Sequence, residues 1–265
     1  MVQILLGIII LCLGFYVFKK YPLKKDNRAL VMSALFIVLS VILNRFSMMI
    51  PLFGFESLKI GFELLCLMVA GVLVSPSYAF LIGLAVDLMG LLINPTGFPF
   101  LGFTLNSILS ILIPSLMMVW LKNKTNSQFV KCLRNFMILL SILGISYIFV
   151  TNFVIVGEHK IEIEWIHKII FTIFVIILNI LMLVSHQKIN QKYSKEYLKI
   201  IYSWVSIVLV VEILITFLLT PYWLDVMYGI PFMVSLFIRV IKAFIMIPLD
   251  IIIGFLTIRV LIKRN

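Results

Sequence analysis

The stretch VDLMGLLINPTGFPFLGFTL, residues 86–105, places an aspartate inside an apolar run and follows it with a turn rich in proline and glycine. On a helix Ala79, Gly83, Asp87 and Gly90 are spaced four, four and three residues apart, so they share one face. Small residues on such a face let a second helix approach closely. We therefore predict that Asp87 faces protein and not lipid.

The composition of the whole chain is typical of a polytopic membrane protein. Of its 265 residues 63% are hydrophobic and 12% are charged, and the mean hydropathy is +1.20, outside the range of soluble domains. Apolar runs long enough to cross the hydrocarbon as helices predict an all-α bundle of about nine transmembrane helices. The predicted spans are residues 2–18, 28–50, 60–74, 78–93, 103–121, 135–156, 167–185, 201–220 and 235–262.

Within this bundle Asp87 needs an explanation, because a charged group at the centre of a span costs about 2.5 to 3.5 kcal/mol on insertion scales. It is either part of a functional site or a clamp that joins helices by hydrogen bonds. Glu63, Glu212 and Asp250 also fall in or near predicted spans. Each of these lies nearer a span end or lacks a comparable stripe of small residues.

Lysines and arginines gather on alternate connections between the predicted spans. Cytoplasmic flanks carry the excess of such residues, which predicts an outside N-terminus and a cytoplasmic C-terminus. The net charge of +11 is therefore explained by membrane topology and does not indicate nucleic-acid binding. The cytoplasmic flanks hold 16 of the 22 cations: Lys19, Lys20, Lys24, Lys25, Arg28, Lys122, Lys124, Lys131, Arg134, Lys188, Lys192, Lys195, Lys199, Arg259, Lys263 and Arg264.

Four cations on the opposite side lie near the outer ends of predicted spans: Arg45, Lys59, Arg239 and Lys242. If these ends converge, they form a basic funnel suited to phosphate or carboxylate groups. Alternatively, each side chain extends separately to the lipid headgroups.

The turn after Asp87 leads into a helix whose first residues are polar. Thr104 and Asn106 lie there with the free amide donors of a helix N-terminus, which suits an anion or a polar ring. Phe98, Phe100 and Phe103 add flat apolar surfaces. This combination predicts a flat heteroaromatic ligand, and the alternative is that the phenylalanines anchor the chain at the membrane interface.

Three stretches of the chain together carry a family resemblance. SPSYAFLIGLAVDLMGLLINPTGFPFLGFTLNSIL (residues 75–109), PYWLDVMYGIPFMVSLFIRVIKAFIMIPLDIIIGFL (residues 221–256) and LKIGFELL (residues 58–65) resemble the folate-specific substrate-binding (S) components of energy-coupling factor transporters. The resemblance covers residues 28–121 and 197–263. It implies a bacterial cell-membrane protein with a six-helix core that captures folate or reduced folates from outside.

The resemblance also implies roles for particular residues. The outer cations would hold the glutamate carboxylates of folate, and Trp223, Tyr228 and Phe103 would stack on its rings. Thr104, Asn106 or Asp87 would meet the donor and acceptor edge of the pterin. Energy would come from a transmembrane coupling subunit and its ATPases, since no phosphate-binding loop motif occurs in this sequence. The equivalent of the family's coupling surface would involve Ala29, Ser33 and Ala34.

The chain departs from the family in having three additional helices. We predict an extra N-terminal helix with a basic loop (1–27), core helices 1–4 (28–121), an inserted helical pair (122–196) and core helices 5–6 (197–265). The insertion preserves topology, because two crossings return the chain to the same side. An S component for another vitamin, such as riboflavin, would share this architecture.

Two other classes of protein remain as alternatives. An intramembrane enzyme using Asp87 and Glu63 would need a paired acid and base or metal ligands, whereas His159, His167 and His186 lie in loops or at span ends. A non-catalytic scaffold would not need the outer cations. Because Cys12, Cys66 and Cys132 show no paired spacing, we expect no disulfide and no zinc site. Since the sequence shows neither a paired acid and base nor metal-ligand spacing, we also expect no cofactor and no enzymatic activity.

Overall fold

The computed structural model describes residues 2–52, 55–93, 99–121, 127–150, 153–156, 159–162, 164–166, 168–169, 172–173, 175–177, 179–180, 183 and 195–263. The structure is a helical bundle with two short β-hairpins. Its elements are α1 (Val2–Lys20), α2 (Asn27–Arg45), β1 (Met48–Leu52), β2 (Phe55–Ile60), α3 (Glu63–Leu73), α4 (Pro76–Ile93), α5 (Leu101–Leu121), α6 (Ser127–Val150), β3 (Phe153–Val156), β4 (His159–Glu162), α8 (Lys195–Val211), η1 (Glu212–Leu219), α9 (Thr220–Tyr228) and α10 (Phe232–Lys263).

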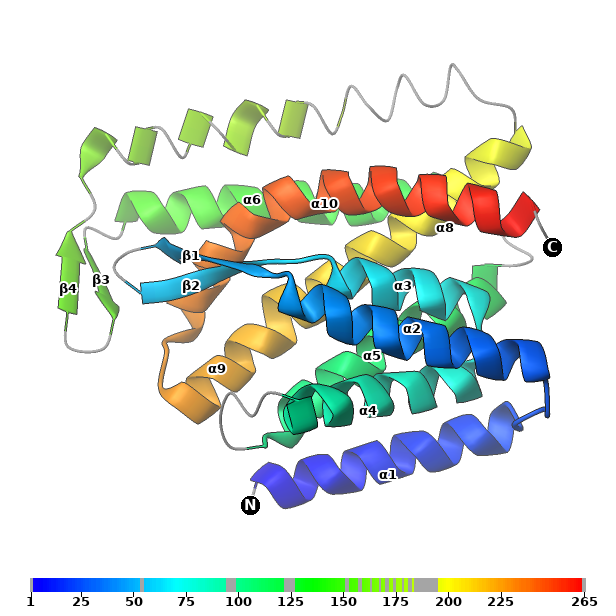
Figure 1. Ribbon diagram of the computed structural model, residues 1–265. Coiled ribbons are helices and arrows are strands. Elements are labelled where there is room, and N and C mark those ends of the chain that lie inside the picture. The colour runs from blue at the N-terminus through cyan, green and yellow to red at the C-terminus, as the bar shows by residue number, and fades with distance from the viewer. Residues whose placement is uncertain are drawn as a thin grey trace.

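The long helices run side by side and alternate in direction (Figure 1). The starts of α1, α3, α5 and α10 share one end of the bundle with both hairpins, which we call the hairpin end. The α1–α2 connection, the turn between α3 and α4 and the C-terminus lie at the opposite end. Among the described helices, this alternation is the one that successive membrane crossings require. Much of the predicted span 167–185 lies outside the described residues.

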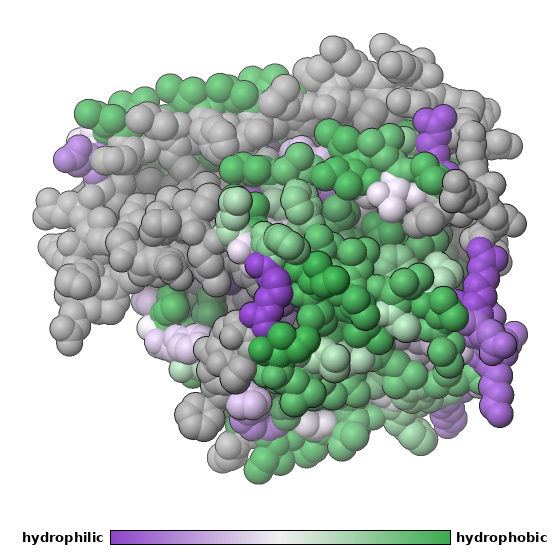
Figure 2. Space-filling model, viewed as in Figure 1, coloured by the Kyte–Doolittle hydropathy of each residue, from purple (hydrophilic) through white to green (hydrophobic). Residues whose placement is uncertain are grey.

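Several helices meet the requirements for crossing a membrane. Five of the described helical segments are long and apolar enough: α1, α2, α4, α5 and the continuous helix Leu198–Tyr228. Large apolar side chains are exposed on their outer faces, among them Leu11 at 75% and Phe15 at 72%. Figure 2 shows an apolar surface over one face of the molecule, as expected where lipid replaces water. The protein is therefore membrane-embedded, although the nine crossings stay a prediction.

The two hairpins depart from the predicted all-α fold. The second predicted span extended to residue 50, but α2 ends at Arg45 and β1 begins at Met48. Pro51 explains part of this, because the residue before a proline is driven to extended conformations and proline has no N–H for a helix. β1 and β2 pair antiparallel, and their register shifts between Ile50 and Pro51. Likewise, α6 ends at Val150, and residues 153–156 form β3 where the sixth span was predicted.

Two apolar clusters form the core. The first joins α1, α4 and α5 around Ala79, Ile82 and Ile108, which are fully buried. The second joins α3, α8, η1 and α10 around Met68, Trp204 and Ile207. Helix α5 lies between the two clusters, since it packs on α3 and α4 and also on α8.

The long helix Leu198–Tyr228 contains a π-helical segment, η1, over residues 212–219. The amide of Thr220 donates to the carbonyl of Ile215, five residues earlier. π-helical turns are rare and frequently occur at functional sites. The helix then ends at Gly229, whose φ of +65° provides the left-handed turn of a glycine C-cap.

Helix α1 is attached to the core at both of its ends. At the hairpin end, the Gln3 amide donates to the Pro99 carbonyl and accepts from the Leu101 amide, both at 3.1 Å. At the opposite end, the Tyr78 hydroxyl donates to the Lys24 carbonyl at 2.8 Å, and the Ser77 hydroxyl donates to the Tyr21 carbonyl. These bonds connect α1 and its following loop to the starts of α5 and α4.

Candidate functional site

Gly83 sets the distance between α4 and α5. A Cβ atom added at Gly83 would lie 2.6 Å from the Cα of Ile108 and 2.8 Å from the carbonyl oxygen of Ser107. Ala79, one turn earlier, is fully buried. The predicted close approach of a second helix is confirmed at these two positions. It does not extend to Gly90, where an added Cβ would meet nothing within 4 Å.

Asp87 faces this helix contact, as its spacing predicts. The hydroxyl of Thr104, in the first turn of α5, donates to Oδ2 of Asp87 at 2.7 Å. Asp87 is half-buried and Thr104 is buried. The hydrogen bond gives Asp87 the clamping contact that we considered from sequence, and it occupies only one carboxylate oxygen.

Asn106 joins α5 to α9 by two hydrogen bonds. Its amide donates to the Thr220 hydroxyl at 3.1 Å, and its carbonyl oxygen accepts from the Trp223 indole at 3.1 Å. Thr220 in turn donates to the Ile215 carbonyl at 2.7 Å. We call Asp87, Thr104, Asn106, Thr220 and Trp223 the α5 polar cluster.

A row of aromatic rings adjoins this cluster. Trp223 packs edge-on against Phe100 with centroids 5.7 Å apart, and Phe100 contacts Phe103 in the same way at 5.7 Å. Tyr222 adds a further contact to Trp223 at 4.9 Å. Gly102 makes room for these rings, because a Cβ there would lie 2.3 Å from the ring of Phe100. Trp223 and Phe103 are thus brought together, whereas Tyr228 is exposed at the end of α9.

The four predicted outer cations do not share one environment. Arg45 is exposed at the last residue of α2. Arg239 and Lys242 lie seven and ten residues after the start of α10, about 10 and 15 Å along the helix. Both are partly buried and interact electrostatically with Glu212. The side chain of Lys59 lies outside the described part of the chain, so the basic funnel stays a prediction.

The residues predicted to contact a coupling subunit lie in the first turns of α2. Ser33 is buried, and its hydroxyl donates to the Ala29 carbonyl at 2.6 Å. Ala29 packs against the core, and Ala34 is exposed. Of the three side chains, that of Ala34 is therefore the one presented to the surroundings.

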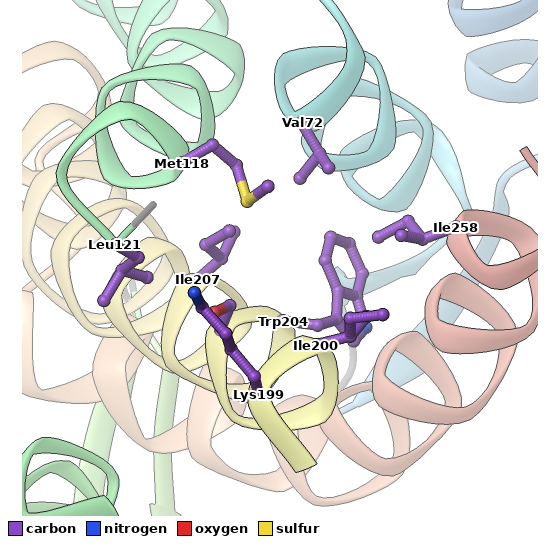
Figure 3. A pocket seen from close by; sticks show the side chains of 9 residues that line it. Val72, Met118, Leu121, Lys199, Ile200, Trp204, Ile207 and Ile258 are labelled. Carbon is purple, nitrogen blue, oxygen red and sulfur yellow. The ribbon is translucent and has the colours of Figure 1, made fainter. Parts of the chain in front are cut away.

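A cavity of about 210 Å³ lies between α3, α5, α8 and α10 (Figure 3). Its wall is mainly apolar, with Lys199 and Ser203 as its polar members, and Trp204 extends across it. The cavity is far along the bundle from the α5 polar cluster, since Leu121, the last residue of α5, also lines it. It was not predicted from the sequence, in which its apolar residues look like any other core positions.

Several site features were missed or judged minor from the sequence. Thr220 is one: a single hydroxyl beside a proline gives no signal of its contact with Asn106, 114 residues away. Glu212 and Asp250 are both 1% exposed on facing helical segments. Among the described residues, three or more His, Cys, Asp or Glu side chains do not come together in a group that could hold a metal.

Comparison with known proteins adds no identification. No protein-family model matches the chain, and no curated protein matches it. What the chain does must therefore be argued from the residues and their geometry.

Proposed function

We propose that the protein is the substrate-binding subunit of an energy-coupling factor transporter and binds folate or reduced folates from outside the bacterial cell. One observation supports this most. Residues that the sequence singled out in three separate stretches form two hydrogen-bonded pairs in the first turns of α5: Thr104 with Asp87 of α4, and Asn106 with Trp223 of α9. Polar groups beside aromatic rings, at the end of a helical bundle, suit a heteroaromatic ligand.

A pterin carries hydrogen-bond donors that suit an acceptor of this cluster, the Oδ1 atom of Asp87. No described residue donates a hydrogen bond to Oδ1 of Asp87, which can therefore accept from a ring N–H or amino group of a ligand. A charge-assisted bond of this kind is worth about 1.5 to 3 kcal/mol. Asn106 and Trp223 bind each other and are buried, so in our proposal they position the aromatic row.

The anionic tail of the ligand accounts for cations on the outer side. Arg45 is exposed at the hairpin end, and Arg239 lies about two turns along α10, which starts at the same end. Either guanidinium can bind a carboxylate in a bidentate manner. This favours folates over thiamine, which is itself a cation.

The test is equilibrium binding to the purified full chain in lipid nanodiscs. Folic acid and 5-formyl-tetrahydrofolate are expected to bind with micromolar or tighter affinity, and riboflavin and thiamine are not. Asp87→Asn is expected to weaken folate binding by about 10-fold to 100-fold, since each 1.4 kcal/mol is tenfold. Asp225→Asn, an exposed acid on α9, is the matched control and is expected to change nothing.

Two results would refute the proposal. Tight binding of riboflavin without folate would assign the protein to another vitamin. Absence of binding for all four compounds by a well-folded preparation would favour a scaffold role. If Asp87→Asn binds folate normally, the site lies elsewhere in the molecule.

A further inference from the structure

Glu212 and Asp250 are buried carboxyl groups near the middle of two neighbouring helical segments. Glu212 is the first residue of η1, within the apolar helix Leu198–Tyr228. Asp250 lies about 27 Å along α10 from its start. Each is 1% exposed, and η1 packs against α10.

Three oxygens of this pair lack hydrogen-bond partners among the described residues: Oε2 of Glu212 and both carboxylate oxygens of Asp250. A buried acceptor without a partner costs about 1 to 3 kcal/mol, and more if it is charged. Such groups persist where something else satisfies them in the working protein. The missing group must be a donor or a cation.

The surrounding charges identify which cation is suitable. Lys242 and Arg239 of α10 interact electrostatically with Glu212, and Asp250 interacts with Glu212 and Lys242. Two carboxylates beside two cations offer too few oxygens for a hard metal ion, which takes six or more. A proton needs one oxygen only.

The other helices packed against this pair differ in the titratable groups that they carry. Helix α5 carries no charged residue, and α3 carries Glu63 and Cys66. The titratable residues of α8 and α9 are Lys195, Glu196, Tyr197, Lys199, Tyr202, Tyr222, Asp225 and Tyr228. The indole of Trp204, on α8, donates to the backbone carbonyl of Asp250 at 3.1 Å and also lines the cavity of Figure 3. Trp204 therefore connects the backbone of Asp250 to the wall of this cavity.

We propose that Asp250 and Glu212 form an intramembrane proton-binding pair, in which a proton from water adds to one oxygen of Asp250. A hydronium ion supplies the proton: one of its O–H bonds breaks, which leaves water, and an O–H bond forms on the carboxylate. Loss of the negative charge on Asp250 weakens its electrostatic interaction with Lys242. The attraction between Lys242 of α10 and Glu212 of η1 is then no longer shared with Asp250. The π-helical segment η1, which begins at Glu212, is placed to respond to such a change. This inference does not depend on which solute the protein binds.

The test is a pH titration of the full chain in nanodiscs, with Trp204 emission as the readout. The difference between wild type and Trp204→Phe isolates that residue among the four tryptophans. We expect a pH-dependent change of emission that is lost in Asp250→Asn and retained in the control Asp225→Asn. Infrared difference spectra should show the carbonyl band of a protonated carboxyl group on acidification, also lost in Asp250→Asn.

A variant that keeps both carboxyl groups tests the pair without removing it. In Lys242→Gln a neighbouring positive charge is lost, so protonation becomes easier and the midpoint of the transition is expected to move to higher pH. A transition that survives unchanged in both Asp250→Asn and Glu212→Gln would overturn the proposal. A change of Trp204 emission when sodium is replaced by choline at constant pH would also overturn it, since the pair would then bind an alkali cation.

Discussion

Asp87 and Asp250 are both aspartates within apolar helices, yet their surroundings differ. Asp87 is half-buried and accepts a hydrogen bond from Thr104. Asp250 is 1% exposed, and neither of its carboxylate oxygens has a hydrogen-bond partner in the part of the chain that the structure describes. Intramembrane carboxyl groups are functional candidates in general. Among the described residues, Asp87 has one carboxylate oxygen in a hydrogen bond and one without a partner, whereas both oxygens of Asp250 are without partners.

The hydrogen bond between Thr104 and Asp87 should contribute measurably to stability. Replacing Thr104 by valine keeps the shape of the side chain and removes the donor. Hydrogen bonds between helices in membrane proteins average about 0.6 kcal/mol and reach about 1.7 kcal/mol, so we expect a loss of unfolding free energy in this range. Thermal or denaturant unfolding in one detergent measures it.

A double-mutant cycle shows whether that loss belongs to the pair. In an Asp87→Asn background, Thr104→Val is expected to cost less than in wild type, because the partner charge is already absent. Equal losses in both backgrounds would mean that Thr104 stabilises the protein through packing instead.

For single residues, the sequence predicted which way a side chain faces better than it predicted which residue that side chain contacts. The spacing of Ala79, Gly83 and Asp87 was enough to place the carboxylate against protein. Nothing in the sequence pairs Trp223 with Asn106, because the two residues are 117 positions apart and meet only through the packing of α5 on α9. Burial of Asp250 was underestimated for the same reason, since it depends on the position of η1.

Among the elements, α4 and α5 form the contact on which the candidate site depends. Their bounds were predicted within two residues, since both are long apolar runs flanked by proline or glycine. The hairpin at residues 48–60 was missed because short apolar strands and helix extensions have the same hydropathy. Likewise, the π-helical segment at 212–219 has no sequence signal in its run of apolar residues.

Two glycines of α4 provide a matched test of this contact. Gly83→Ala would place a methyl group against the backbone of Ile108, so we expect a loss of about 1 to 3 kcal/mol of stability. Gly90→Ala meets open space and gains helix propensity, so it should be neutral or stabilising by up to about 1 kcal/mol. The melting temperatures of wild type, Gly83→Ala and Gly90→Ala, measured in the same detergent, test this expectation.

The outcome of this test bears on the α4–α5 contact alone. If Gly83→Ala is as stable as Gly90→Ala, the two helices are further apart than the structure places them. A loss of stability in Gly90→Ala would instead indicate that another helix or subunit covers that face.

For the whole molecule, hydropathy predicts the membrane-spanning helices and the distribution of charge predicts their orientation. Helices alternate in direction along the chain, and Lys19, Lys20, Lys24 and Lys25 fall at the end opposite the hairpins. The predicted orientation puts that end in the cytoplasm. The arrangement of the inserted segment could not be predicted in full, because its sequence alternates between apolar runs and charged residues.

Cysteine labelling tests this orientation directly. In a variant with Cys12, Cys66 and Cys132 replaced by serine, Lys25→Cys is expected to resist a membrane-impermeant maleimide in intact cells and to react in inverted vesicles. Asp225→Cys, exposed near the hairpin end, should react in intact cells. The reverse pattern would invert the topology and move the candidate site to the cytoplasmic side.

The double attachment of α1 has a mechanical consequence for the molecule. Gln3 holds the backbone just before α5, and the loop after α1 is held by Tyr78 at the start of α4. If the protein tilts within the bilayer as the proposed transporter subunit would, α1 would therefore be carried along with α4 and α5. It would widen the moving body and would not serve as a stationary pivot for it.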